Sequence, residues 1–129
     1  KTFIKYYQVM KSWNARVLAG LPSAIYLFAL FLKEKSLKLQ FDIIFTSSEQ
    51  LFDYQEKVLE EVFSGKVIDH YGHGEPGSFC ASRCDFGNYH INPATTFSEV
   101  TPNGSLLETS LLNFSQPFVR YDIGDQISS

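Results

Sequence analysis

Two segments near the start of the chain predict helices, the first of them from apolar side chains at helical spacing. The first covers residues 1–19 and ends at Gly20. The second begins at Pro22, because the missing N–H of proline is not needed in a first helical turn. It continues over residues 24–35 and is apolar on all sides as far as Leu32, so we expect this helix to be largely buried.

A strand, a helix and a second strand are predicted next. Residues 41–46 are mostly aromatic and β-branched, as in a buried strand. Ser47 and Gln50 have the spacing of a capping box for the following helix, which ends at Gly65. Residues 66–70 supply the second strand. A strand, a helix and a strand within about 30 residues predict a βαβ unit with parallel strands and a right-handed crossover.

Beyond Tyr71 the apolar pattern changes from helical spacing to alternation, which predicts strands. The alternating segments are residues 78–84, 89–92, 95–101, 104–112 and 117–121. Pro102-Asn103-Gly104 separates two of them and predicts a hairpin turn, because Asn-Gly readily adopts positive φ. We therefore predict an α/β fold, with a parallel βαβ core over residues 1–77 and a β-rich subdomain over residues 78–129.

Composition narrows the classes of function. The chain has 129 residues, of which 44% are hydrophobic and 16% aromatic, as in one globular domain. The net charge is −3, so the chain lacks the excess of basic residues that binds nucleic acid or an anionic membrane, and neither is an expected partner. The apolar run over residues 24–32 falls short of the ~20 residues that span a bilayer. Two cysteines and no signal peptide favour a cytoplasmic location, and the oligomeric state is open.

Candidate chemistry is expected in the loops that follow the predicted strands, because ligands of parallel sheets bind beyond the carboxyl ends of the strands. Three such loops cover residues 46–49, 71–77 and 120–125. The second combines an aromatic ring at Tyr71, several glycines and a carboxylate at Glu75. These features suit a nucleotide bound with Mg²⁺. The ring can stack on a base, glycine backbone lets a ligand approach closely, and the carboxylate offers an oxygen ligand to a hard cation.

Two of these loops resemble motifs of adenylate-forming enzymes. Tyr71-Gly72-His73-Gly74-Glu75 is similar to their Tyr-Gly-x-Thr-Glu motif. Tyr121-Asp122-Ile123-Gly124-Asp125 is similar to their Tyr-Arg-Thr-Gly-Asp motif. The chain most resembles phenylacetate–coenzyme A ligases and CapK-type capsular polysaccharide biosynthesis proteins, through the further segments Gly20–Ser23, Thr46–Glu49 and Pro117–Tyr121. The motifs occur in family order, and the resemblance runs from about residue 15 to 126.

The resemblance implies roles for individual residues. Tyr71 would stack on adenine, Glu75 would hold Mg²⁺ in the catalytic site, and Asp125 would bind the ribose hydroxyls. The other implied nucleotide-binding positions are Gly72, His73 and Gly74 in the first motif and Ser47, Ser48 and Glu49 beside the adenine pocket. Two positions depart from the family pattern. Gly74 replaces a threonine whose hydroxyl meets the α-phosphate, and Asp122 replaces an arginine.

The reaction implied by the resemblance activates a small-molecule carboxylic acid with ATP and transfers the acyl group of the adenylate to coenzyme A or another acceptor. We expect residues 1–129 to be part of the large N-terminal domain of such a ligase, acting in capsular or surface polysaccharide biosynthesis. The upstream phosphate loop and the C-terminal domain with its catalytic lysine are expected outside this chain, which alone should not turn over. The alternative is a noncatalytic nucleotide- or zinc-binding module of the same fold.

Cys80, Cys84 and His90 are candidate ligands for a structural Zn²⁺. Zinc prefers thiolate and imidazole ligands, and strand alternation places both cysteines on one face. Some ligases similar to this subfamily carry a Cys/His metal site in this region. The spacing supplies no obvious fourth ligand, so two buried small side chains and a surface histidine are the alternative interpretation.

Overall fold

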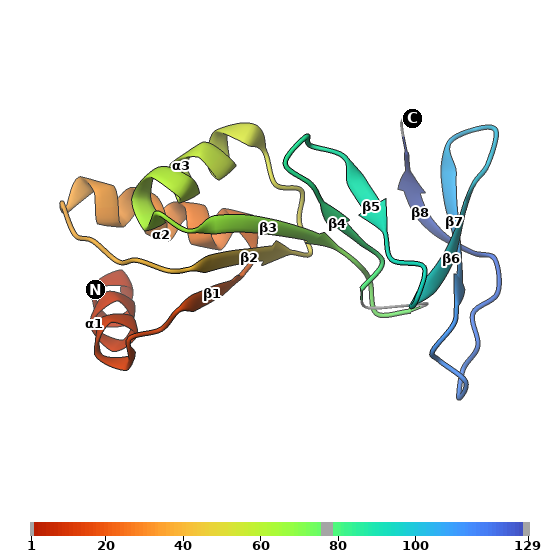
Figure 1. Cartoon of the computed structure of the whole chain (residues 1–129), viewed down its shortest axis with the longest axis horizontal. Coiled ribbons are helices and arrows are strands. Elements are labelled where there is room, and N and C mark those ends of the chain that lie inside the picture. Colours follow the sequence, from red (N-terminus) through yellow and green to blue (C-terminus); the bar gives the residue numbers. More distant parts are fainter. Residues whose placement is uncertain (1, 76–78, 128–129) are drawn as a thin grey trace. The chain divides into compact units, whose positions relative to one another are not determined.

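The computed structural model describes residues 2–75 and 79–127, which form two compact units, Lys1–Asp69 (unit 1) and His70–Ser129 (unit 2). The elements along the chain (Figure 1) are α1 Thr2–Trp13, β1 Val17–Gly20, α2 Pro22–Glu34, β2 Ile43–Ser47, α3 Asp53–Phe63, β3 Lys66–Tyr71, β4 Ala81–Arg83, β5 Tyr89–Ile91, β6 Thr96–Val100, β7 Ser105–Ser110 and β8 Tyr121–Gln126. The last two residues of β3 belong to unit 2, so this strand supplies both units.

Unit 1 has a sheet in which β1, β2 and β3 are neighbours in that order. β1 and β2 are parallel, with Val17 opposite Ile43, and β3 runs beside β2 in the same direction (Figure 1). The helices α2 and α3 pack against each other. The core consists of Leu18, Ile25, Phe28, Ala29, Leu32, Phe41, Ile44, Leu51, Leu59 and Phe63. The predicted α/β fold with a parallel core is therefore confirmed.

The first predicted helix is wrong over its C-terminal third. α1 ends at Trp13, and Asn14 has a φ of 50°, which right-handed helical backbone does not allow. Val17–Gly20 then forms β1 instead of the end of a helix. Only Leu18 of these four residues is buried, so the segment shows little of the alternation by which a strand is recognised.

α2 begins at Pro22 as predicted, but the expectation that it is largely buried is wrong. Its buried residues follow one face, whereas Leu27 and Leu30 on the other side are 55% and 38% exposed. The helix packs on α3 and the core of unit 1 along that one face, and a single contact face leaves the opposite side uncovered. Among the described residues, no helix is both long enough and apolar enough to span a membrane.

The third predicted helix starts later than expected. β2 continues through Ser47, so the capping box of Ser47 and Gln50 is wrong, and α3 begins at Asp53. The side chain of Gln55 provides the cap instead, because its Oε1 accepts the N–H of Phe52 at 3.0 Å. A glutamine side chain thus reaches back to the residue before the helix, as in a capping box. It is the side chain of Gln55, five residues further along the chain than the predicted Gln50.

Unit 2 consists of antiparallel pairings. β4 pairs with the end of β3 and with β5, and β6, β7 and β8 form a separate three-stranded sheet. The hairpin predicted at Pro102-Asn103-Gly104 joins β6 to β7, and Gly104 has a φ of 86°. The predicted strand at residues 117–121 is wrong except for Tyr121, where β8 begins. Arg120 has a φ of 49°, which interrupts extended backbone at that point.

Gly65 joins α3 to β3 where backbone passes close to backbone. A Cβ at this position would lie 2.3 Å from the carbonyl oxygen of Phe41 and 2.8 Å from Cδ1 of Ile44. We expect Gly65→Ala to lower the free energy of unfolding by about 1–3 kcal/mol, because the backbone must move to admit a methyl group. Urea denaturation measures the change, with Gly20→Ala as the control, since a Cβ there makes an ordinary 3.6 Å contact with Ile25. Equal stability of the two variants would contradict this prediction.

Candidate functional site

Two residues from the two motifs meet in unit 2. Tyr71 is the last residue of β3 and Asp125 lies in β8, 54 positions further along the chain. The phenol of Tyr71 donates a short hydrogen bond to Oδ2 of Asp125. Burial raises the pKa of Tyr71, and the hydrogen bond to Asp125 and its negative charge add to the shift. The phenol is therefore a protonated donor, and the fold brings together the residues predicted to contact adenine and ribose.

A tight turn within β8 places Asp125. Oδ1 of Asp122 accepts the N–H of Gly124 at 2.9 Å, and Gly124 has a φ of 84°. A short carboxylate that binds backbone two residues ahead forms an Asx turn, which the larger arginine of the family pattern would not form. The departure at Asp122 thus has a local structural reason.

The loop after β3 carries two side chains that differ in exposure. The side chain of His73 is 16% exposed, whereas that of Glu75 is 53% exposed, with Oε2 of Glu75 3.8 Å from Nδ1 of His73. A Cβ at Gly74 would meet no described atom within 4 Å. Gly72 joins Tyr71 to this loop, and residues 76 and 77 of the predicted loop lie outside the described residues.

Glu75 fits the requirements of a magnesium ligand. Mg²⁺ keeps several water molecules and binds through one or two carboxylates together with substrate phosphates. The exposed carboxylate of Glu75 meets that requirement, and the space beside Gly74 is free of other described atoms.

The predicted Ser47, Ser48 and Glu49 belong to unit 1. Oε2 of Glu49 accepts the N–H of Ser23 at 3.1 Å, in the first turn of α2. Hydrogen bonds from Ser23 lower the pKa of Glu49, which stays ionised at the positive end of this helix. The hydroxyls of Ser47 and Ser48 lie 3.3 Å apart at the end of β2. Glu49 therefore caps a helix of unit 1, in addition to any role toward a ligand.

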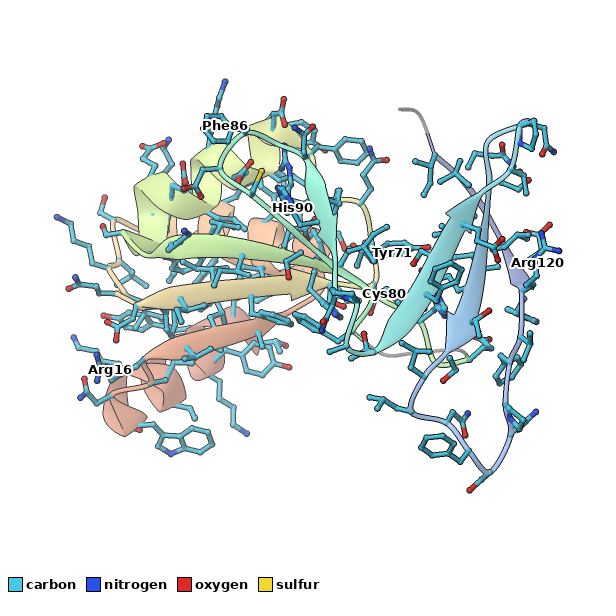
Figure 2. All side chains as sticks on the ribbon, turned by 45° about the vertical axis from the view of Figure 1, so that its right-hand side comes forward. Arg16, Tyr71, Cys80, Phe86, His90 and Arg120 are labelled. Carbon is cyan, nitrogen blue, oxygen red and sulfur yellow. The ribbon has the colours of Figure 1, made fainter. Side chains whose placement is uncertain are left out.

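The three predicted zinc ligands do not form one group. A backbone hydrogen bond from Phe86 is the largest cause that lowers the pKa of the Cys84 thiol, and a hydrogen bond with His90 adds to it. Figure 2 shows His90 on the side of the Phe86 loop and apart from Cys80. The structure thus brings Cys84 and His90 together and gives Cys80 other neighbours.

The neighbours of Cys80 are His73 and Glu108. Its Sγ lies 3.6 Å from Nε2 of His73 and 3.2 Å from Oε2 of Glu108, and those two atoms are 3.2 Å apart. Burial raises the pKa of Cys80 to about 12, with a further contribution from the hydrogen bond to Glu108. We refer to these three residues as the His–Cys–Glu cluster.

Glu108 is the residue that the sequence analysis missed. It is 1% exposed and lies in β7 at a position that alternates with Leu107 and shares a face with the buried Leu106. A carboxylate at an apolar position of an alternating strand is the signal that would have found it. Two hydroxyl residues at alternate positions of the preceding strand, Thr96 and Ser98, strengthen that signal.

Comparisons with known proteins show what the fold is similar to. No family model matches the sequence, and no curated protein matches it. An open 2-hydroxyisobutyryl-CoA ligase in complex with 2-HIB-AMP and CoA matches with a TM-score of 0.78 and 21% identity, over 95% of this chain and 33% of that one.

Two further structures are similar. The anthranilate CoA ligase AuaEII in complex with anthranoyl-AMP has a TM-score of 0.61 at 17% identity, over 85% of this chain and 24% of that one. An AMP-forming acyl-CoA synthetase/AMP-acid ligase II-like protein from Dyadobacter fermentans DSM 18053 has a TM-score of 0.61 at 15% identity, over 88% and 33%. The chain thus has the fold of a segment of adenylate-forming ligases and spans at most a third of the length of these three structures.

The Tyr71–Asp125 hydrogen bond gives a prediction about alkaline stability. We expect Tyr71→Phe to lower the free energy of unfolding by about 0.5–1 kcal/mol at neutral pH. Above a pH of about 10 the unfolded phenol ionises while the folded phenol keeps its proton, so the stability contributed by Tyr71 is lost as the pH rises. The gap between the wild-type protein and Tyr71→Phe should therefore shrink in this range, as measured by chemical denaturation across pH.

Tyr121→Phe is the control for this experiment, because it removes a phenol from β8, the strand of Asp125, and keeps the ring against Phe118. If the difference in free energy of unfolding between the wild-type protein and Tyr71→Phe stays constant with pH, the pKa of Tyr71 is not raised in the folded state.

Proposed function

We propose that this chain is the nucleotide-binding part of an adenylate-forming ligase. The ligase would activate a small carboxylic acid with ATP and pass the acyl group to coenzyme A or another acceptor. The hydrogen bond between Tyr71 and Asp125 is the observation that carries this proposal, because it joins the two motifs at the residues implied for adenine and ribose. The likeness in fold to ligases in complex with acyl-adenylates agrees with it.

The proposed chemistry needs no protein nucleophile. A carboxylate oxygen of the substrate attacks the α-phosphorus of ATP, the bond to the β-phosphate oxygen breaks, and pyrophosphate leaves. A thiol or other nucleophile then attacks the acyl carbon and displaces AMP. In this scheme Tyr71 stacks on adenine, Asp125 accepts hydrogen bonds from the ribose, and Glu75 holds Mg²⁺, which offsets phosphate charge.

The finer assignment is to the phenylacetate–coenzyme A ligase and CapK-type subfamily, with a role in capsular or surface polysaccharide biosynthesis. Its support is the order of the motifs, including Gly20–Ser23 and Pro117–Tyr121. The same assignment gives the whole ligase a phosphate loop and a catalytic lysine outside residues 1–129. Ser47, Ser48 and Glu49 are proposed to line the adenine side of the site.

ATP–pyrophosphate exchange tests the proposal in the protein that carries this sequence, with Mg²⁺ and a panel of aryl, acyl and amino acids. Exchange that depends on one acid is expected, and Glu75→Gln should reduce it about tenfold or more by removing the metal-binding charge. Glu61→Gln is the control, since Glu61 is a similarly exposed carboxylate that pairs with Lys33 in unit 1. Absence of exchange with every acid, in protein that binds AMP, would contradict the enzymatic proposal and support a noncatalytic module.

Gly74→Thr distinguishes a working site from a degenerate one. A side chain fits at this position, because a Cβ there would meet no described atom within 4 Å. In a working ligase whose backbone N–H groups already bind the α-phosphate, we expect the added hydroxyl to change ATP affinity by less than about tenfold. Calorimetric titration with ATP measures the change. Binding that is undetectable in the wild-type protein and appears in Gly74→Thr would contradict the working site.

A further inference from the structure

The His–Cys–Glu cluster gathers three kinds of metal ligand from separate segments of unit 2. His73 follows β3, Cys80 directly precedes β4, and Glu108 lies in β7. Their ligand atoms all lie within 4.8 Å of one another, and the contacts between pairs are 3.2 to 3.6 Å. Nitrogen, sulfur and oxygen ligands at usual zinc bond lengths and tetrahedral angles are about 3.3–3.6 Å apart. The cluster thus has the dimensions of a zinc site.

The carboxylate of Glu108 is held in place before any ion binds. Oγ1 of Thr96 donates to Oε2 of Glu108 at 3.0 Å, and Oγ of Ser98 donates to Oε1 at 3.0 Å. Both hydroxyls come from β6, where Ser98 lies directly opposite Glu108. Outer hydrogen bonds of this kind orient metal-binding carboxylates and are a regular part of metal sites.

The charge of Glu108 has little compensation from protein cations. It is 1% exposed, and among residues 2–75 and 79–127 no lysine or arginine pairs with it. Burying a carboxylate is costly unless an opposite charge offsets it. A divalent cation bound to this carboxylate and to the thiolate of Cys80 would bring the total charge of the group to zero. The charge balance therefore favours a doubly charged ion.

The imidazole of His73 has a nitrogen that the cluster leaves unsatisfied. Nδ1 is buried and makes no hydrogen bond within the described part of the chain, while Nε2 points to Cys80 and Glu108. A histidine that binds a metal through one nitrogen usually donates its other N–H to a carboxylate, a backbone carbonyl or water. Oε2 of Glu75 lies 3.8 Å from Nδ1, in position to become that acceptor.

We propose that Nε2 of His73, Sγ of Cys80 and the carboxylate of Glu108 bind one zinc ion. The thiolate and imidazole select zinc over Mg²⁺ or Ca²⁺, which prefer oxygen ligands. On binding, the Cys80 thiol loses its proton to solvent as the sulfur–zinc bond forms. Three protein ligands leave the fourth position for water or an external ligand, as in zinc sites that are not purely structural.

This site differs from the one predicted from the sequence, in which Cys80 joins Cys84 and His90. Both sites use Cys80, so they cannot be filled together. The number of sulfur ligands separates them, because the proposed site contains one cysteine and the sequence-predicted site contains two. The variants Cys80→Ser and Cys84→Ser form a matched pair, since each removes one of the two cysteines in the sequence.

The test is titration of the metal-free full chain with Co²⁺, followed by competition with Zn²⁺ and X-ray absorption of the zinc-loaded protein. We expect one ion per chain, a thiolate-to-cobalt charge-transfer band and a single sulfur neighbour of zinc. Cys80→Ser, His73→Gln and Glu108→Gln should each weaken binding about tenfold or more, whereas Cys84→Ser should leave it unchanged. Glu108→Gln keeps the size of the side chain, and circular dichroism checks that each variant folds.

Three outcomes would overturn the proposal. They are no charge-transfer band at any Co²⁺ concentration, two sulfur neighbours around zinc, and loss of binding in Cys84→Ser with retention in Glu108→Gln. The first would leave the cluster as a hydrogen-bonded group only, and the other two would assign the metal to the sequence-predicted ligands. The measurements use neither ATP nor a carboxylic acid, so their result does not depend on the proposed ligase activity.

Discussion

The antiparallel pairing of β3 with β4 is the interaction on which the site in unit 2 depends. Tyr71 lies opposite Ala81, and the N–H of Cys80 donates to the carbonyl oxygen of Tyr71 at 3.1 Å. This register returns the chain beside the end of β3, where His73 reaches the sulfur of Cys80. A shift of one residue would turn alternate side chains to the other face of the strand and separate these groups. The positions of the His73 and Cys80 side chains thus depend on backbone hydrogen bonds.

The two units are stabilised in different ways. Unit 1 has an apolar core with several aromatic rings, in which the hydrogen bond of Thr46 to Asp69, at 2.5 Å, joins two buried polar side chains. Unit 2 instead buries Glu108 among hydroxyl, thiol and imidazole groups. Apolar burial adds up over many contacts, whereas a polar network depends on each partner being present. Unit 2 holds the three ligands of the proposed zinc site, so it is the unit that a bound ion would stabilise.

Much of the fold could be predicted because apolar periodicity is strong where one face is buried. Pro22 and the apolar run that follows it also predict α2, and the Asn-Gly pair predicts the turn at Gly104. β1 could not be predicted, because a four-residue strand with one buried side chain is defined by its pairing with β2. The order of the motifs indicated that Tyr71 and Asp125 act together. The neighbours of Cys80 depend on a loop and on distant strands, so local spacing grouped it with Cys84 and His90 and not with His73 and Glu108.

The different surroundings of the two cysteines give them different reactivity toward oxidants and alkylating agents. Such reagents attack the thiolate and need access to the sulfur. Cys80 is buried and its thiol is held by Glu108, whereas Cys84 is partly exposed and hydrogen bonds favour its thiolate. Oxidative damage in this part of the chain would therefore begin at Cys84, in the turn before β5, and spare the sulfur beside the motif loop.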